Sequence, residues 1–134
     1  MGDIALAVIG GTGVYKLADL HDVDTRNVQT RFGEPSGPIR IGTLLGQRVA
    51  FLARHGEGHS VPPHLVNYRA NLAALKDIGA TRVLALNTVG GIGDAFGPRV
   101  LVCPDQLIDY TWGRISTICE EPGTDVVHVD FGDP

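Results

Sequence analysis

The chain has 134 residues, of which 43% are hydrophobic and 19% are charged. This balance is typical of one globular domain with a buried core and excludes a disordered chain. The formal net charge of −4 and the lack of a basic run argue against nucleic acid and an anionic membrane surface as partners. No apolar run approaches the roughly 20 residues that a membrane helix needs.

The two cysteines, Cys103 and Cys119, are far apart and neither belongs to a CxxC pair. They do not indicate a disulfide framework, so we expect reduced thiols and a cytoplasmic location. The apolar start of the chain, over residues 4–9, lacks a basic flank and a small-residue cleavage site. It therefore favours a strand over a signal peptide.

The first half of the chain contains three predicted strands. Residues 4–9 form a continuous apolar run that ends in the GGTG sequence of residues 10–13. This pattern is typical of a buried, central strand that leads into a tight loop. Residues 39–44 and 48–52 predict a short hairpin whose strands are separated at residues 46–47.

The clearest helix signal runs from Pro63 to Gly79, where apolar residues recur at three- or four-residue spacing. Pro62 and Pro63 suit the start of this helix, and Gly79 suits a left-handed cap at its end. Residues 82–89 are apolar and rich in β-branched side chains, which predicts a strand. A strand–helix–strand order implies a parallel, right-handed crossover, and the whole pattern favours an α/β fold with a mixed sheet.

The last third of the chain is harder to interpret. Residues 100–102 and 126–129 predict two short strands, whereas residues 105–117 have no clear pattern. The sequence stops directly after the last predicted strand, without a helix to cover it. We therefore expect residues 1–134 to be part of a longer domain.

Charged and imidazole side chains crowd the loop that joins residues 48–52 to the predicted helix. Its glycines and prolines oppose regular structure, and such loops on rigid scaffolds often carry function. A guanidinium fork and an imidazole directly after an apolar strand favour binding of an anion such as phosphate, whereas either residue alone suits a surface role. The polar members of this loop are Arg54, His55, Glu57, His59 and His64.

Two further loops carry polar groups after predicted strands. Residues 10–13 offer backbone N–H groups and the Thr12 hydroxyl to an anion, although an ordinary turn is the simpler interpretation, and they match neither GxGxxG nor the P-loop. Asn87 and Thr88 end the strand over 82–89, where a flexible turn is again the alternative. Parallel strands would bring all three loops to one edge of the sheet.

A metal site and a protein nucleophile are both disfavoured. His55, Glu57 and His59 alternate, so an extended loop could hold a metal ion with His64 as a fourth ligand. The glycines between them and the lack of supporting ligands elsewhere argue against this, and no metal is predicted. No GxSxG or Cys/His pattern appears, so no catalytic residue is assigned. His128 lies among apolar residues, where a structural core histidine is the usual role.

Three separated motifs resemble those of the purine nucleoside phosphorylases, specifically the methylthioadenosine phosphorylase branch. They are IGGTG near the start, RHGEGH with the following PPH and VNYRAN, and LNTVGGI. The resemblance covers nearly the whole chain. Within the branch, DYTWGRIST and HVDFGDP are most similar to the bacterial S-methyl-5′-thioinosine phosphorylases.

This resemblance implies a three-layer α/β/α sandwich, with residues 1–134 as the N-terminal portion of a single domain. It implies phosphorolysis of S-methyl-5′-thioinosine to hypoxanthine and 5-methylthioribose 1-phosphate, with phosphate as co-substrate, no cofactor and assembly into a homotrimer or a higher homo-oligomer. S-methyl-5′-thioadenosine or general purine nucleosides are alternative substrates, and a non-enzymatic nucleoside- or metal-binding module is an alternative class. Family members hold the base with residues from a later part of the chain, so we expect residues 1–134 alone to be inactive.

The resemblance also implies roles for particular residues. The phosphate site would comprise Thr12, Arg54, His55, Asn87 and Thr88, and the nucleoside site would comprise His59, Thr88, Val89, Gly90 and, from a neighbouring subunit, His128. Thr88 departs from the many relatives that carry Ala at this position. Its hydroxyl would join the phosphate site or narrow it.

Overall fold

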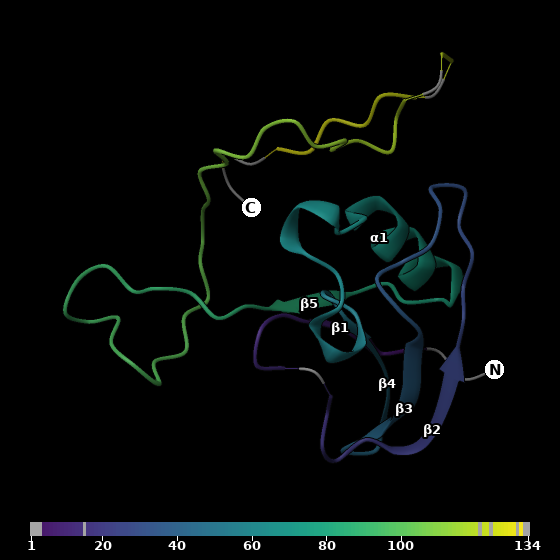
Figure 1. Cartoon of the computed structure of the whole chain (residues 1–134), viewed down its shortest axis with the longest axis horizontal. Coiled ribbons are helices and arrows are strands. Elements are labelled where there is room, and N and C mark those ends of the chain that lie inside the picture. The colour runs from purple at the N-terminus through teal and green to yellow at the C-terminus, as the bar shows by residue number, and fades with distance from the viewer. Residues whose placement is uncertain (1–3, 15, 121, 124, 131, 133–134) are drawn as a thin grey trace. The chain divides into compact units, whose positions relative to one another are not determined.

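The computed structural model describes residues 4–14, 16–120, 122–123, 125–130 and 132. The chain divides into two compact units, residues 1–88 and 89–134, and each is described by itself. The first unit contains a five-stranded sheet and the helix α1 (Tyr68–Asp77) (Figure 1). None of the helices in the described ranges combines the length and apolar character required to cross a bilayer.

The sheet is mixed, with the strand order β2-β3-β4-β1-β5. Strand β1 lies between β4 and β5 and runs parallel to both, while β3 pairs antiparallel with β2 and β4. The predicted α/β fold, the mixed sheet and the interior position of the first apolar strand are confirmed. The bounds are β1 Leu6–Gly10, β2 His21–Arg26, β3 Ile39–Leu44, β4 Gln47–Ala53 and β5 Val83–Leu86.

Strand β2 was not predicted from the sequence. Its six residues, HDVDTR, are nearly all exposed, so no apolar alternation marks them. The strand is held at the edge of the sheet by backbone pairing with β3, with an irregular register between His21 and Asp24. A strand that is held by backbone pairing rather than by buried side chains is difficult to predict from a sequence.

The predicted hairpin forms, with its turn one residue earlier than expected. Leu44 pairs with Gln47, and the two turn residues, Leu45 and Gly46, have φ angles of 49° and 76°. Positive φ at both positions is the type I′ geometry, which matches the twist of the flanking strands. Leu45 is fully exposed at this turn.

The two faces of the sheet bury separate sets of apolar side chains, because successive residues of a strand point to opposite faces. In β4, Ala50 and Leu52 pack on the face that holds Ala74 and Leu75 of α1. Val49 and Phe51 pack on the opposite face, which is covered by side chains from the loop after β1, including Val14, Leu17 and Leu20.

Helix α1 begins later than the apolar spacing predicted. Residues Pro63–Leu65 form a separate 3₁₀ turn, and Val66 is extended at φ −64° and ψ 120°. Asn67 then caps the helix, since its side chain accepts a hydrogen bond from the Ala70 amide at 3.1 Å. The prediction of a helix start at Pro63 was therefore wrong, because the apolar spacing continues through the 3₁₀ turn and the extended Val66, which are not part of the α-helix.

The end of α1 matches the prediction. Gly79 has a φ of 93°, and its amide donates to the carbonyl of Lys76 at 2.9 Å. The Ala80 amide donates to the carbonyl of Leu75 at 3.0 Å. These two bonds form a Schellman motif, which satisfies carbonyls that the end of a helix would otherwise leave open.

Two asparagines of this region fasten the segment between β2 and β3 to the helix. The Asn67 side chain donates to the carbonyl of Phe32 at 2.7 Å. Asn71, which is 2% exposed, accepts from the Ser36 amide and donates to the Ser36 hydroxyl. Full pairing makes the burial of a polar amide tolerable.

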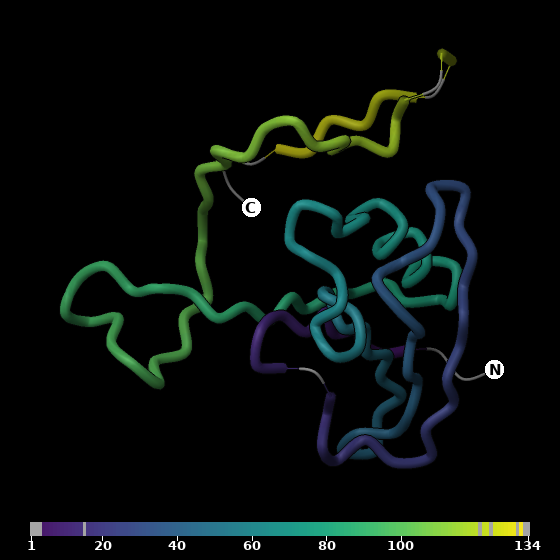
Figure 2. Tube along the Cα trace, in the orientation of Figure 1, coloured from purple at the N-terminus to yellow at the C-terminus, as the bar shows by residue number. Residues whose placement is uncertain are grey.

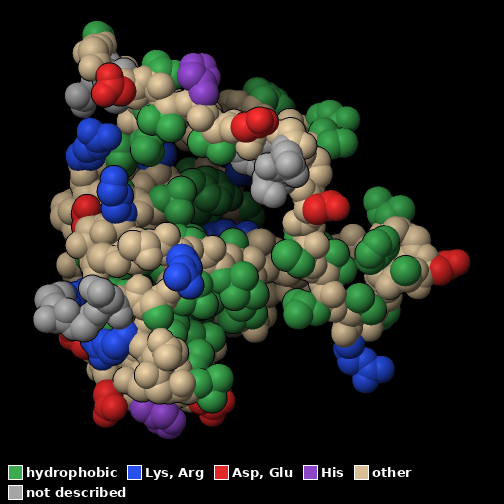
Figure 3. All heavy atoms as spheres, turned by 180° about the vertical axis from the view of Figure 1, so that it is seen from behind, with side chains coloured by type: hydrophobic (Ala, Val, Ile, Leu, Met, Phe, Trp, Pro, Cys, Tyr) green, Lys and Arg blue, Asp and Glu red, His purple; other side chains and the backbone are tan. Residues whose placement is uncertain are grey.

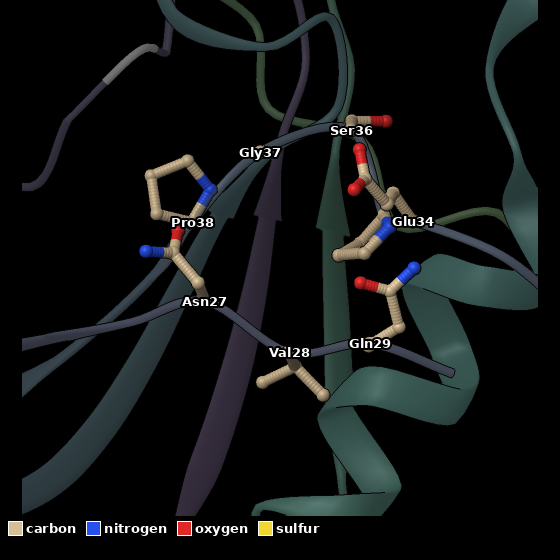
Figure 4. A pocket seen from close by; sticks show the side chains of 8 residues that line it. Asn27, Val28, Gln29, Glu34, Ser36, Gly37 and Pro38 are labelled. Carbon is tan, nitrogen blue, oxygen red and sulfur yellow. The ribbon is translucent and has the colours of Figure 1, made fainter.

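A cavity of about 390 Å³ lies between residues 27–29 and 34–38 of the same segment. In Figure 4, Asn27 and Gln29 point toward residues 34–38, whereas Val28 points away from them. Val28 packs against the core cluster on the α1 face. None of the residues predicted to bind phosphate or nucleoside lines this cavity.

The second unit, which the chain enters after β5 (Figure 2), is irregular throughout its described residues. The predicted strands over 100–102 and 126–129 were wrong, because a strand needs a neighbouring strand to pair with and neither segment pairs as a strand with any described segment. Phe131, Asp133 and Pro134 of the HVDFGDP motif lie outside the described residues.

Side chains of this second unit are largely exposed, and Figure 3 shows hydrophobic side chains on the surface of the molecule. Ile92, Leu101 and Trp112 are the most exposed large apolar residues in the described part of the unit. Hydrogen bonds from the hydroxyl and amide of Thr111 lower the pKa of Asp109 below its ordinary value. Cys103 and Cys119 are free thiols.

The Asn67 cap gives a test of how α1 is fixed. Asn67→Ala removes both the cap and the bond to Phe32, and we expect it to lower the free energy of unfolding by about 1–2 kcal/mol. Asn67→Ser is the matched control, because a serine hydroxyl restores the cap but not the bond to Phe32. Urea denaturation should place the serine variant between the alanine variant and the wild type. Equal stability of the two variants would show that the cap contributes nothing.

Candidate functional site

Three parallel strands end at the same level of the sheet. Gly10 at the end of β1 pairs with Ala53 at the end of β4 and with Leu86 at the end of β5. Beyond this level, the Arg54 amide donates to Gly10 and the Gly11 amide donates to Leu86, at 2.9 and 2.8 Å. The predicted convergence of the three loops on one edge is confirmed by these contacts. Open α/β sheets bind their ligands at such carboxyl ends.

Gly11 allows the three loops to approach one another. A side chain at Gly11 would place its Cβ 2.6 Å from the Leu86 carbonyl oxygen and 2.9 Å from Nη2 of Arg54. Gly10 is more confined still, since its Cβ would lie 2.1 Å from the Val14 carbonyl oxygen. These distances are too short for real contacts, so the strand end requires glycine at both positions.

Arg54 connects two of the loops through its side chain. Its Nη1 donates to Oδ1 of Asn87, and its Nε donates to Nε2 of His55 at 3.3 Å. The third nitrogen, Nη2, packs against the backbone at Gly11. A guanidinium held in this way is a fixed donor for an anion.

His55 is buried directly behind Arg54, with 5% of its surface exposed. Its Nδ1 lies 3.0 Å from the carbonyl oxygen of Val61, and the Val61 amide donates to the His55 carbonyl at 2.8 Å. The loop that follows is tightly turned, with positive φ at Gly56, Gly58 and His59. His59 lies on this turn, exposed, with its ring centroid 4.5 Å from that of His55.

The first and third loops are joined by one hydrogen bond. Thr88 donates its hydroxyl proton to the carbonyl of Thr12 at 2.7 Å. The Thr12 side chain is exposed, and the next residue, Gly13, turns the loop with a φ of 87°. The hydroxyl of Thr88 therefore fixes the backbone that carries Thr12.

An open cavity of about 550 Å³ lies between the first loop and the turn that carries His59. Arg40 of β3 and Glu57 form an ion pair at its wall. Both side chains are substantially exposed, so the pair adds little to stability and mainly fixes the two groups. The lining residues are Gly13, Lys16, Ala18, Arg40, Glu57 and Gly58.

The structure brings together five of the residues predicted to form the site and leaves others apart. Thr12, Arg54, His55, Asn87 and Thr88 are joined by the contacts above, with His59 beside His55. Val89, Gly90 and His128 belong to the second unit. His128 is exposed among the residues that the structure describes, and its role stays a prediction.

The alternating His55, Glu57 and His59 do not gather as ligands. Among the described residues, no group of three His, Cys, Asp or Glu side chains could hold a metal ion. Glu57 instead pairs with Arg40, and Nδ1 of His55 is bound to a carbonyl. His64 is exposed on the 3₁₀ turn over Pro63–Leu65.

Several contributors to the site were not predicted from the sequence. The carbonyl of Val61 fixes His55, and Lys16 and Arg40 line the adjoining cavity. A backbone carbonyl has no signature in a sequence. Arg40 lies within a strand that was recognised by its apolar residues, so nothing indicated a functional role for it. The GGTG sequence was the one available signal for the close approach at Gly11.

Gly11→Ala tests whether the close approach of the loops is required. We expect the added methyl group to lower the free energy of unfolding by about 1–3 kcal/mol, the usual range for overpacking. Gly97→Ala is the matched control, because nothing lies within 4 Å of a Cβ at Gly97. Thermal unfolding of both variants is the measurement. A Gly11→Ala variant as stable as Gly97→Ala would show that the loops separate freely.

Comparison with known proteins identifies the family to which these features belong. The sequence model of the Phosphorylase superfamily matches residues 5–134. A probable S-methyl-5′-thioinosine phosphorylase of Xanthomonas campestris is 79% identical over 98% of this chain and 52% of its own length. A purine nucleoside phosphorylase of Streptomyces coelicolor is 47% identical over 96% of this chain and 48% of its own length. The chain thus spans about half the length of the curated relatives it matches.

Solved structures agree with this relationship. An adenosine/methylthioadenosine phosphorylase of Schistosoma mansoni, a double mutant in complex with adenine, is similar with a TM-score of 0.58 and 43% identity. The match covers 62% of this chain and 29% of that protein. A methylthioadenosine phosphorylase from an antarctic soil metagenomic library gives a TM-score of 0.56 at 42% identity, again over 62% of this chain and 29% of that protein. The profile match, the curated relatives and these structures together show that the chain belongs to the phosphorylase superfamily.

Proposed function

We propose that the protein carrying this chain is a nucleoside phosphorylase that acts on S-methyl-5′-thioinosine. The products would be hypoxanthine and 5-methylthioribose 1-phosphate. The observation that carries the proposal is the Arg54 cluster, in which a fixed guanidinium lies at the carboxyl ends of three in-register strands. The choice of substrate is supported by relatives of 79% and 71% identity named as probable S-methyl-5′-thioinosine phosphorylases.

Phosphate would lie against Arg54 and the loops that meet it. Asn87 accepts from the guanidinium, Thr88 follows Asn87 and donates to the Thr12 carbonyl, and the backbone at Gly11 packs against Nη2 of Arg54. His55 adjoins the same group from the buried side. A dianion in this position would gain charge-assisted hydrogen bonds, which are the strongest that proteins form.

The chemistry needs a positioned anion more than a reactive side chain. An oxygen of phosphate would attack C1′ of the ribose as the bond from C1′ to the purine nitrogen breaks, with the electron pair leaving on the base. The sugar passes through a cationic, oxocarbenium-like state, which a bound dianion stabilises. Positioning and electrostatic stabilisation can each lower such a barrier by several kcal/mol.

The nucleoside would occupy the open cavity between the first loop and the turn that carries His59. Its volume of about 550 Å³ falls within the usual range for small-molecule sites. His59 would lie toward the ribose, with Thr88, Val89 and Gly90 along the nucleoside. Phosphate would be a co-substrate, and no cofactor takes part in the proposed reaction.

We also propose a homotrimer in the cytoplasm, in which His128 reaches the substrate of a neighbouring subunit. The exposure of His128 and the free thiols of Cys103 and Cys119 support these assignments. Apolar side chains at the surface of the second unit, such as Ile92 and Trp112, suit burial by further protein.

A comparison of substrates tests the proposed reaction. The protein at its natural full length is supplied with S-methyl-5′-thioinosine, S-methyl-5′-thioadenosine and inosine in turn, and the released base is quantified with and without phosphate. We expect phosphate-dependent release and the highest kcat/KM for S-methyl-5′-thioinosine.

The other outcomes of this comparison separate the alternatives. A higher kcat/KM for S-methyl-5′-thioadenosine would favour the second candidate, which is supported by relatives of that name at 37–46% identity. Nucleoside binding without phosphate-dependent release would indicate a binding module and would overturn the proposal.

The role of His128 can be separated from a structural one. His128→Ala should lower kcat/KM for the methylthio-nucleoside, while changing the free energy of unfolding by less than about 0.5 kcal/mol, as is usual for an exposed residue. His21→Ala is the matched control, since His21 is also exposed but lies at the start of β2. Unchanged kinetics in the His128 variant would exclude it from the substrate site.

A further inference from the structure

We propose that His55 is a positioning residue that orients Arg54, and that its ring does not itself donate to phosphate. This inference rests on the proposed function and assigns a specific role within the same site. It follows from three observations: the partners of the two ring nitrogens, the burial of the ring and the closed loop that holds it.

The partners of the imidazole determine which nitrogen carries the proton. Nδ1 lies 3.0 Å from the Val61 carbonyl oxygen, which can only accept, so Nδ1 must donate. Nε2 lies 3.3 Å from Nε of Arg54, which can only donate, so Nε2 must accept. Only a neutral imidazole with its proton on Nδ1 satisfies both contacts. Nε2 in this form has no proton to give to an anion.

The ring has no freedom to exchange these partners. His55 is 5% exposed, and its backbone carbonyl accepts from the Val61 amide at 2.8 Å. Residues 55 and 61 are thus linked by one backbone and one side-chain bond, which closes the intervening loop into a ring. A side chain at Gly56 would lie 2.7 Å from the Ser60 hydroxyl and 2.8 Å from the Ser36 carbonyl oxygen, so this loop is closely packed.

The consequence for Arg54 is a guanidinium fixed along two of its edges. His55 accepts a hydrogen bond from Nε on the buried side, and Asn87 accepts one from Nη1. The plane of the guanidinium is then set before any ligand arrives, with Nη2 packed against the backbone at Gly11. A preorganised fork loses less side-chain entropy on binding than a mobile one.

Two substitutions separate the acceptor for Arg54 from the donor for Val61. The amide oxygen of His55→Gln can take the place of Nε2 and accept from Arg54, whereas the amide nitrogen of His55→Asn takes the place of Nδ1 and serves only Val61. We expect the phosphate KM to stay within about threefold of wild type in the glutamine variant and to rise about tenfold or more in the asparagine variant, with a smaller change in kcat.

A double-mutant cycle distinguishes positioning from direct contact. Arg54→Lys removes the Nε donor, so in that background His55→Gln and His55→Asn should have the same phosphate KM. A further rise in KM on His55→Asn in the Arg54→Lys background would show that His55 contacts phosphate itself and would overturn the inference. Near-wild-type phosphate KM in the single asparagine variant would also overturn it.

Two further measurements keep the inference separate from the proposed function. The ¹⁵N resonances of the His55 ring, recorded without phosphate, should show the Nδ1–H form, and a proton on Nε2 would overturn the inference by itself. Equilibrium dialysis with radiolabelled phosphate should show that the wild type binds the anion. If the wild type does not bind phosphate, both the phosphorylase proposal and this role are rejected. If it binds phosphate but the effects of the Arg54 and His55 substitutions on the phosphate KM are additive, only the role of His55 is rejected.

Discussion

The close approach of backbone at the end of β1 is the constraint on which the site depends. Gly10 lies level with the ends of both neighbouring strands, and Gly11 leaves no room for a side chain between Leu86 and Arg54. Because the register of three parallel strands fixes where each loop begins, donors that are far apart in the sequence emerge side by side. The electrostatics of the cluster are therefore a result of sheet geometry, and the glycines are as necessary to it as the charged side chains.

Much of this arrangement could be predicted from the sequence where burial dictates the pattern. The apolar runs over β1 and β4 and the β-branched run over β5 marked the parallel strands, and the loops that follow them held the residues found together. Gly79 marked the end of α1 because only a left-handed residue completes the Schellman motif. In each case burial of a side chain or a required backbone angle restricts which residue types can occupy the position.

The remainder could not be predicted because it depends on backbone partners. Strand β2 is polar and is held by pairing alone, and the helix start is set by the extended Val66 rather than by a change in apolar spacing. The segments over 100–102 and 126–129 have the composition of strands, yet no described strand pairs with them. The tautomer of His55 likewise depends on the carbonyl of Val61, which any residue would supply equally well.

The order of the strands in the sheet has a consequence for how the molecule folds. The pairing of β3 with β4 closes a two-residue turn, whereas β1 must find β4 more than 40 positions away and β5 more than 70 positions away, as the register Ala7↔Ala50 and Ala7↔Val83 shows. Closing longer loops costs more chain entropy, so local pairs form early and the insertion of β1 between its neighbours comes late. Arg54 meets Asn87, and Thr88 meets Thr12, only after that last step. The cluster of residues around Arg54 is thus a product of completed folding, and a chain trapped before β1 has docked would contain every donor and yet lack their arrangement.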